Sequence, residues 1–158
     1  MPLLIHATQK LLAELPVALI EHDAIGDSWH ANLLRIDRRK CVLFTHDATL
    51  YSVFVPSLRK PDFAQLDQVF GQRVFKTLLW EGFPQPSIER MLDTCRAVRF
   101  TRTNNRRVLG SMNDLSFQIE VGVAHAGGLD QVDLADLHQR LNRTLLSAVG
   151  YRYPVEGL

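Results

Sequence analysis

The first part of the chain carries short runs of β-forming residues that polar turns separate. Segments 3–7, 29–36, 41–45 and 50–55 are rich in β-branched, aromatic and other apolar residues. The connections between the last three are short, which predicts an antiparallel meander. The middle segment, 41–45, is almost wholly apolar, so we expect both of its faces to be covered. Pro56 is expected to end the last of these strands.

From Phe63 onward, apolar residues recur at three- and four-residue steps, which is typical of helices. Ser87 is expected to cap one of them. One further strand is expected at 97–101 and a flexible break at 124–128. Together with a short helix near the N-terminus, the predicted helices cover 8–15, 63–82, 87–95, 108–122 and 134–149.

These elements predict an α+β fold in which about five helices pack against a small antiparallel meander of three to five strands. The length of 158 residues favours one domain over residues 1–158. The composition, 46% hydrophobic and 22% charged, is that of an ordinary globular domain.

Neither a membrane span nor a secretion signal is visible in the sequence. No run approaches the roughly 20 apolar residues that a membrane helix needs, and the first residues lack a basic region followed by a long apolar one. Cys41 and Cys95 lie outside any CxxC pair, so we expect buried free thiols in a reducing compartment. The expected location is therefore the cytoplasm, without membrane contact.

Charge is distributed unevenly along the chain. The segment from Arg96 to Arg107 carries five arginines and no acid, whereas Val108 to Gln139 carries five acids and no lysine or arginine. Because the net charge is only +1, the imbalance is local and can create a directed surface field. Such a field suits an anionic ligand or an oppositely charged partner.

The basic segment leads into an Asn-rich stretch at the start of a predicted helix. If Thr103 or Asn104 is the N-cap, the backbone N–H groups and the helix dipole that follow attract anions, and arginines add bidentate contacts. The alternative is a solvated helix face with a capping asparagine. The candidate ligand-binding residues of this region are Arg99, Asn104, Asn105, Arg106, Ser111, Asn113 and Asp114.

A second basic segment lies at the turn between the first two strands of the meander. Arg35 and Asp37 are the candidate ligand-binding residues here, and Tyr51 and Phe54 on a neighbouring strand would offer a stacking platform for bases. The alternative is a charged turn that discourages edge-to-edge pairing of the sheet.

Established catalytic and nucleotide-binding motifs are absent from the sequence. The six histidines show no HExxH or similar ligand spacing, and no GxGxxG, GxxxxGK or GxSxG motif occurs. The adjacent pairs His22–Asp23 and His46–Asp47 are expected to serve turns rather than acid–base chemistry. We therefore expect no metal and no cofactor, and it stays open whether any reaction is catalysed.

Three segments resemble an uncharacterised bacterial family that is catalogued as a domain of unknown function. Residues 31–45 with 49–52 resemble its central hairpin, residues 103–114 its second signature, and residues 6–12 its opening. The resemblance spans most of residues 3–120 and implies one small bacterial domain. It implies no substrate and no catalytic residue.

If the resemblance holds, we expect its signature residues to lie close together in the fold. A helix packed across the sheet would then gather five polar side chains around one cleft. These are Asn32, Asp37, Asn105, Arg106 and Asn113.

The sequence thus favours a binding module for an anionic ligand, either nucleic acid or a phosphorylated small molecule. One alternative is a phosphodiester-cleaving, toxin-like hydrolase, with Asp114, Asp37 or a histidine as base. Another is a protein-interaction subunit, in which the basic segment 96–107 and the acidic segment 114–136 pair between protomers of a homodimer or with a protein partner.

Overall fold

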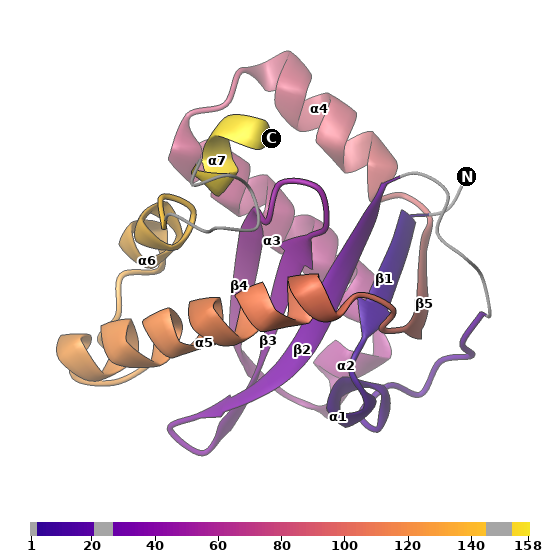
Figure 1. Ribbon diagram of the computed structural model, residues 1–158, viewed down its shortest axis with the longest axis horizontal. Helices are drawn as coiled ribbons and strands as arrows, with labels where there is room; N and C mark the ends of the chain where they lie inside the picture. The colour runs from indigo at the N-terminus through magenta and orange to yellow at the C-terminus, as the bar shows by residue number, and fades with distance from the viewer. Residues whose placement is uncertain (1–2, 21–26, 145–152) are drawn as a thin grey trace.

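A five-stranded mixed sheet lies at the centre of the computed structural model, which describes residues 3–20, 27–144 and 153–158 (Figure 1). The strands run in the order β4-β3-β2-β1-β5. The strands β2, β3 and β4 form the predicted antiparallel meander, and β1 pairs in parallel with both β2 and β5. Their bounds are β1 Leu3–Ala7, β2 Ser28–Ile36, β3 Arg39–His46, β4 Ser52–Leu58 and β5 Val98–Arg102.

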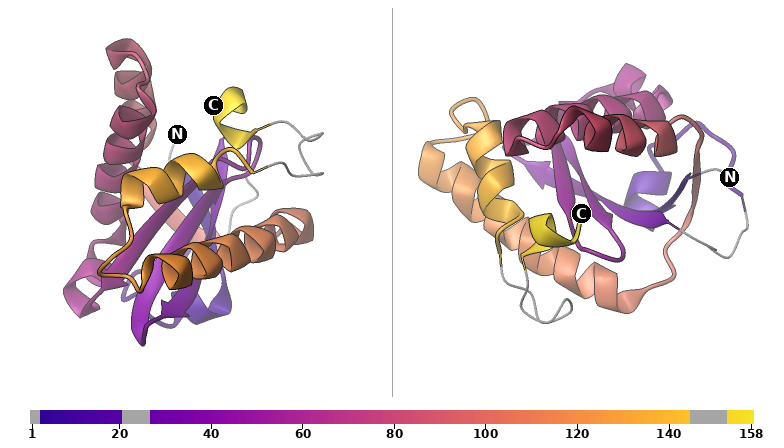
Figure 2. Two further views of the ribbon diagram at one scale, coloured as in Figure 1. Left: turned by 90° about the vertical axis from the view of Figure 1, so that its left-hand side faces the viewer. Right: turned by 90° about the horizontal axis from the view of Figure 1, so that it is seen from above.

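Helices cover both faces of this sheet (Figure 2). The pair α3 and α4 lies on one face, and α5 and α6 lie on the other. The helix bounds are α1 Gln9–Leu12, α2 Lys60–Ala64, α3 Leu66–Glu81, α4 Gln85–Thr94, α5 Arg106–Ala126, α6 Leu134–Leu141 and α7 Pro154–Gly157.

The α+β class and the meander are confirmed. The sheet is mixed rather than antiparallel throughout because β1 and β5 join it in parallel, through long connections that include helices. Parallel neighbours require such crossovers, and the short turns on which the meander prediction rested do not reveal them.

The two faces of β3 contribute to separate apolar cores, as its composition predicted. Val42 and Phe44 pack with the α3 face, and Cys41 and Leu43 pack with the α5 face. The apolar residues of α5 recur at three- and four-residue steps and bury one stripe against the sheet. This stripe consists of Val108, Met112, Leu115, Ile119 and Val123.

Proline and glycine positions misled two of the predicted boundaries. Strand β4 continues through Pro56 to Leu58, which is tolerated because β4 is an edge strand that pairs only with β3. Helix α5 continues through Gly122 and ends at Gly127, whose φ of 98° is left-handed. A Cβ on Gly122 would lie 3.1 Å from Leu137 Cδ1, so this glycine permits the close approach of α6 instead of ending α5.

Other predicted helix boundaries also shift. The helix expected over 63–82 is divided into α2 and α3 at Gln65, whose φ of −132° is not helical. Helix α4 begins at Gln85 after Pro84 as N-cap rather than after Ser87. Helix α1 is shorter than predicted, and α6 ends at Leu141, beyond which 145–149 lie outside the described residues.

Both cysteines are free, Cys41 buried and Cys95 half-buried. Burial raises the pKa of both thiols, that of Cys95 to about 11, so neither is an activated nucleophile. Within the described ranges, no helix is both long and apolar enough to cross a membrane.

His138 of α6 and the C-cap residue of this helix, Asn142, bind the edge of β4 that has no neighbouring strand. The Phe54 backbone N–H donates to His138 Nε2 at 2.9 Å, and the Ser52 N–H donates to Asn142 Oδ1 at 2.7 Å. Asn142 Nδ2 donates back to the Ser52 carbonyl at 2.9 Å. These bonds replace the ladder partners that an edge strand lacks, so α6 also seals the sheet against further strand pairing.

Candidate functional site

A row of buried polar side chains crosses the whole sheet on the face that α5 covers. Thr101, His6, His30, Thr45 and Ser52 are direct neighbours in the registers of β5, β1, β2, β3 and β4. None of them is more than 6% exposed. Buried polar groups are costly unless they are bonded, so a continuous row of them marks a region whose chemistry differs from the rest of the core.

His30 and Asp47 form a dyad within this row. His30 Nδ1 lies 2.7 Å from Asp47 Oδ1, and Ser28 Oγ donates to the other carboxylate oxygen at 2.6 Å. We assign the proton to Nδ1, because the carboxylate accepts it and because the Asn104 backbone N–H faces Nε2 at 3.5 Å. The Nε2 lone pair of His30 is therefore directed at the loop that precedes α5.

His6 stacks on His30, with ring centroids 4.7 Å apart and planes 23° apart. Its Nδ1–H donates to the Arg102 carbonyl at 2.8 Å, which leaves Nε2 as an acceptor. This Nε2 is buried and has no hydrogen-bond partner in the described part of the chain. Burial lowers the pKa of His6, and the neighbouring His30 lowers it further.

The start of α5 lies above the two histidines. Asn105 is its N-cap, and Asn105 Oδ1 accepts from the backbone N–H groups of Arg107 at 3.0 Å and Val108 at 3.2 Å. The N-cap predicted at Thr103 or Asn104 was thus wrong by one or two residues. Capping uses two of the N–H groups, but the first turn contains no acid that would offset the helix dipole.

Three predicted residues come together here, namely Asn104, Asn105 and Arg106, all of them exposed. Ser111 is further along α5 and is 8% exposed, on the side that faces the sheet. Two others, Asn113 and Asp114, are exposed on α5. The contiguous polar stretch in the sequence is therefore divided between the helix start, the sheet-facing side and the solvent-facing side.

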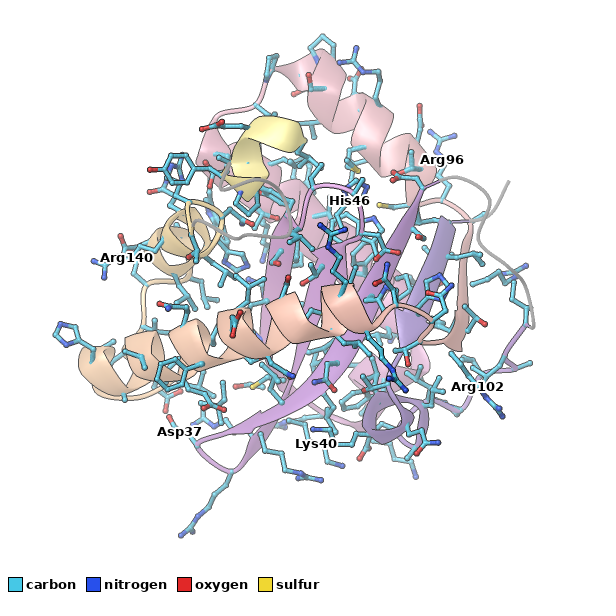
Figure 3. All side chains as sticks on the ribbon, viewed as in Figure 1. Asp37, Lys40, His46, Arg96, Arg102 and Arg140 are labelled. Atoms are coloured by element: carbon cyan, nitrogen blue, oxygen red, sulfur yellow. The ribbon has the colours of Figure 1, made fainter. Side chains whose placement is uncertain are left out.

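The meander hairpin lies far from this helix start. Asp37 Oδ2 accepts from the Leu129 backbone N–H at 2.7 Å, and Arg39 pairs with both carboxylate oxygens of Asp130 at 2.7 and 2.8 Å. Both partners follow the C-terminal end of α5, and Figure 3 shows Asp37 beside that end. The expected cleft that joins Asp37 to Asn105 is therefore wrong, because the 21 residues of α5 separate the two places by about 30 Å.

The other hairpin candidates are also unsuited to that site. Arg35 is exposed, and strand alternation places it on the opposite face of β2 from His30. Tyr51 and Phe54 are both 0% exposed. The predicted stacking platform is wrong, because both rings are enclosed in the apolar cores.

The arginines of segment 96–107 do not form one cluster. Arg96 and Arg102 lie at opposite ends of β5 (Figure 3), and Arg96 pairs with Asp93 at 3.1 Å. Arg99 lines a separate cavity of about 380 Å³, with Asp67 among its other lining residues. The positive charge at the start of α5 therefore comes from the first residues of the helix.

The acidic segment 114–136 is partly neutralised within the molecule. Asp130 pairs with Arg39, and Asp136 pairs with Arg140 at 3.0 Å. A pairing of segments 96–107 and 114–136 between protomers would accordingly involve less free charge than the sequence suggests.

The sequence analysis missed both the His30–Asp47 dyad and the stacking of His6 on His30. His46 and Asp47 were expected to serve a turn, yet Asp47 binds His30, while His46 binds Asp27 and Thr49. The available signal was a histidine inside each of two short apolar strands, His6 in LLIHA and His30 in WHA. That His6 and His30 are neighbours became visible only with the parallel register of β1 and β2.

Comparison with known families agrees with the resemblance seen in the sequence. A family model described as a domain of unknown function, DUF6933, matches residues 4–157. The chain belongs to this family. No curated protein and no solved structure matches it. The DUF6933 match covers nearly the whole chain but assigns no substrate, so the chemistry of the domain has to be argued from its own residues.

The DUF6933 domain brings together two stacked histidines, a carboxylate and a positive helix start. Across residues 3–20, 27–144 and 153–158, no group of three or more His, Cys, Asp or Glu side chains is arranged to hold a metal ion. What the described residues offer is hydrogen bonding, proton transfer and attraction for negative charge.

Proposed function

We propose that this protein binds the phosphate group of an anionic ligand at the start of α5. The observation that carries the proposal is uncompensated positive charge. Arg106, the first residue of α5, is exposed, and no carboxylate among the described residues pairs with it. The first turn of α5 adds no acid.

The helix start supplies the matching donors. The backbone N–H of Arg106 is not used by the Asn105 cap, and the helix dipole favours negative charge there. The Arg106 guanidinium can bind two phosphate oxygens at once. The Nε2 of His6, whose ring stacks on His30, is a further buried polar atom without a hydrogen-bond partner among the described residues.

A phosphate group is shared by nucleic acids and by phosphorylated small molecules, and both fit this chemistry. Nucleic acid would add contacts to neighbouring phosphates, so its affinity should fall steeply as the salt concentration rises. The reason is that protein binding releases counterions from the nucleic acid, and this release is less favourable at high salt. A phosphorylated small molecule would show a shallower salt dependence and a one-to-one stoichiometry. A titration with a labelled single-stranded RNA and a parallel calorimetric titration with pyrophosphate separate the two sources.

The variant Arg106→Ala is expected to weaken binding of whichever probe binds. For RNA, the loss of one phosphate contact should lower the salt slope by about 1. Fluorescence anisotropy between about 50 and 200 mM salt measures both affinity and slope. Arg96→Ala is the matched control, because Arg96 is also exposed but pairs with Asp93 at the other end of β5.

Affinity and slope should be the same for Arg96→Ala and the unaltered protein. Equal weakening by both variants would show a diffuse charge effect instead of a site. The proposal is refuted if neither probe binds, or if Arg106→Ala leaves binding unchanged.

A further inference from the structure

We propose that His30 and His6 form a general base and general acid pair that cleaves RNA with the RNA's own 2′-hydroxyl as the nucleophile. The inference rests on the proposed phosphate site, because the scissile phosphodiester has to lie at the start of α5. It adds a reaction, a substrate class and the residues that carry the reaction.

The base is His30. Asp47 holds its Nδ1–H at 2.7 Å and thereby fixes both the ring orientation and the proton position. The Nε2 lone pair is then directed at the Asn104 N–H, immediately before the helix that binds the phosphate. A carboxylate that orients an imidazole in this way prepares it to accept a proton. Among the described residues, the Asp47 carboxylate hydrogen-bonds to His30 and Ser28, so it is a positioning residue.

The acid is His6. The Arg102 carbonyl fixes its Nδ1–H, and its free Nε2 is the position at which a transferable proton would be carried. Its ring is stacked on His30, with centroids 4.7 Å apart, and both rings contact the chain that leads into α5, His6 at the Arg102 carbonyl and His30 at the Asn104 N–H. A bound phosphate favours the protonated form of a neighbouring imidazole, which opposes the effect of burial on the pKa of His6.

The nucleophile has to come with the substrate. The Ser28 hydroxyl binds the dyad, but it donates to Asp47 and not to His30, so no imidazole activates it. RNA carries a 2′-hydroxyl beside each phosphodiester, and an intramolecular nucleophile already has most of the required orientation. A base and an acid are then the only additional groups that the reaction needs.

The proposed step is balanced in atoms and charge. His30 Nε2 takes the proton of the 2′-hydroxyl, and the 2′-oxygen forms a bond to phosphorus while the bond from phosphorus to the 5′-oxygen breaks. The proton on His6 Nε2 goes to the departing 5′-oxygen. The products are a 2′,3′-cyclic phosphate and a 5′-hydroxyl, and the two histidines regain their starting protonation by exchange with water.

Access requires the loop 103–105 to move, because His30 is 0% and His6 1% exposed. The contact that covers His30 is weak: 3.5 Å between the Asn104 nitrogen and Nε2 is at the long limit for a hydrogen bond. Asn104 itself is exposed. A phosphate that binds this loop can therefore draw the Asn104 N–H away and uncover Nε2.

The test uses the full chain and a short single-stranded RNA that carries a fluorophore and a quencher. We expect cleavage that leaves 2′,3′-cyclic phosphate and 5′-hydroxyl ends, identified by mass spectrometry. The same oligonucleotide made of DNA should bind and remain uncut, because it lacks the nucleophile.

Variants assign the reaction to this site and exclude a contaminating nuclease. His30→Gln should lower kcat by at least about 100-fold. Asp47→Asn should lower kcat and leave KM unchanged, because Asp47 contacts His30 and not the RNA. His125→Gln, which alters an exposed histidine in the last turn of α5, is the control and should cleave normally.

Each outcome decides between the two proposals. RNA that binds and stays intact overturns this inference but leaves the phosphate site standing. RNA that does not bind also overturns this inference, and the phosphate site then stands only if pyrophosphate binds. Cleavage by His30→Gln and by Asp47→Asn at the rate of the unaltered protein also overturns the inference of a histidine pair. If a thermal melt shows that His30→Gln does not fold, Asp47→Asn alone tests the inference. Ser28→Ala is then the matched control, because it removes a partner of Asp47 and leaves the His30–Asp47 bond in place.

Discussion

The native state is expected to lose about 3 kcal/mol of stability through His138 alone as the pH falls from about 6.5 to about 4. His138 is 0% exposed and accepts the Phe54 N–H through Nε2, while its Nδ1–H donates to the Leu134 carbonyl at 2.7 Å. The bond to the Phe54 N–H requires a neutral ring with a lone pair on Nε2, whereas the Nδ1–H can donate in either protonation state. Burial lowers the pKa of His138 from 6.5 to about 4, and the neighbouring Arg73 acts in the same direction.

The sign follows from proton binding. Because the pKa is lower in the folded state than in the unfolded chain, protons favour unfolding in this interval. The stabilisation is therefore complete above about pH 6.5 and is lost progressively towards pH 4. His6 contributes in the same sense, since its pKa is also lowered.

Urea unfolding of the unaltered protein and of His138→Gln over this pH range measures the effect. Glutamine keeps an acceptor near the Phe54 N–H but does not titrate, so the stability difference between the two proteins should change by about 3 kcal/mol across the interval. His125→Gln, at an exposed position, should leave the profile unchanged. Parallel profiles for the unaltered protein and His138→Gln would show that His138 does not titrate as argued.

Removal of the Arg143 side chain is expected to cost about 2–4 kcal/mol. Arg143 binds both carboxylate oxygens of Glu81, at 3.1 and 2.7 Å, and so joins the end of α3 to the segment after α6. The Glu81 side chain is only 1% exposed, whereas that of Arg143 is 46% exposed. Arg143→Ala would leave a carboxylate in the interior without its counter-charge, which is the costly way to break such a pair.

A double-mutant cycle tests this explanation. Glu81→Gln removes the charge, so the added loss from Arg143→Ala should be much smaller in that background. Arg140→Ala is the control, because its pair with Asp136 is mostly exposed and should contribute within about 0.5 kcal/mol. Equal losses from Arg143→Ala in both backgrounds would contradict a role for the buried charge.

Local patterns were sufficient for the class and most of the elements. The meander, the strands β1 and β5, the two-sided burial of β3 and the position of α5 all follow from spacing that neighbouring residues determine. Two of the misplaced boundaries came from the assumption that Pro56 and Gly122 end their elements. Their effects depend on tertiary context, namely an edge position for Pro56 and the close approach of α6 for Gly122.

The candidate site could be predicted only in part. The helix start with Asn104, Asn105 and Arg106 was visible, because a cap and its basic flank are adjacent in the sequence. The histidine pair was not, since His6 and His30 meet through a parallel register that no local pattern encodes. The false addition of Asp37 arose because the helix is long enough to carry its two ends to different parts of the sheet.

The proposed phosphate site lies at the start of α5, next to the buried His6 and His30. Imidazole nitrogen NMR of the protein during titration with a short single-stranded DNA tests it most directly, because DNA carries the phosphates but lacks the reactive hydroxyl. We predict saturable shifts of the His6 and His30 signals, while those of exposed His125 and of buried His138 stay in place. Saturated binding with unmoved His6 and His30 signals would contradict the account.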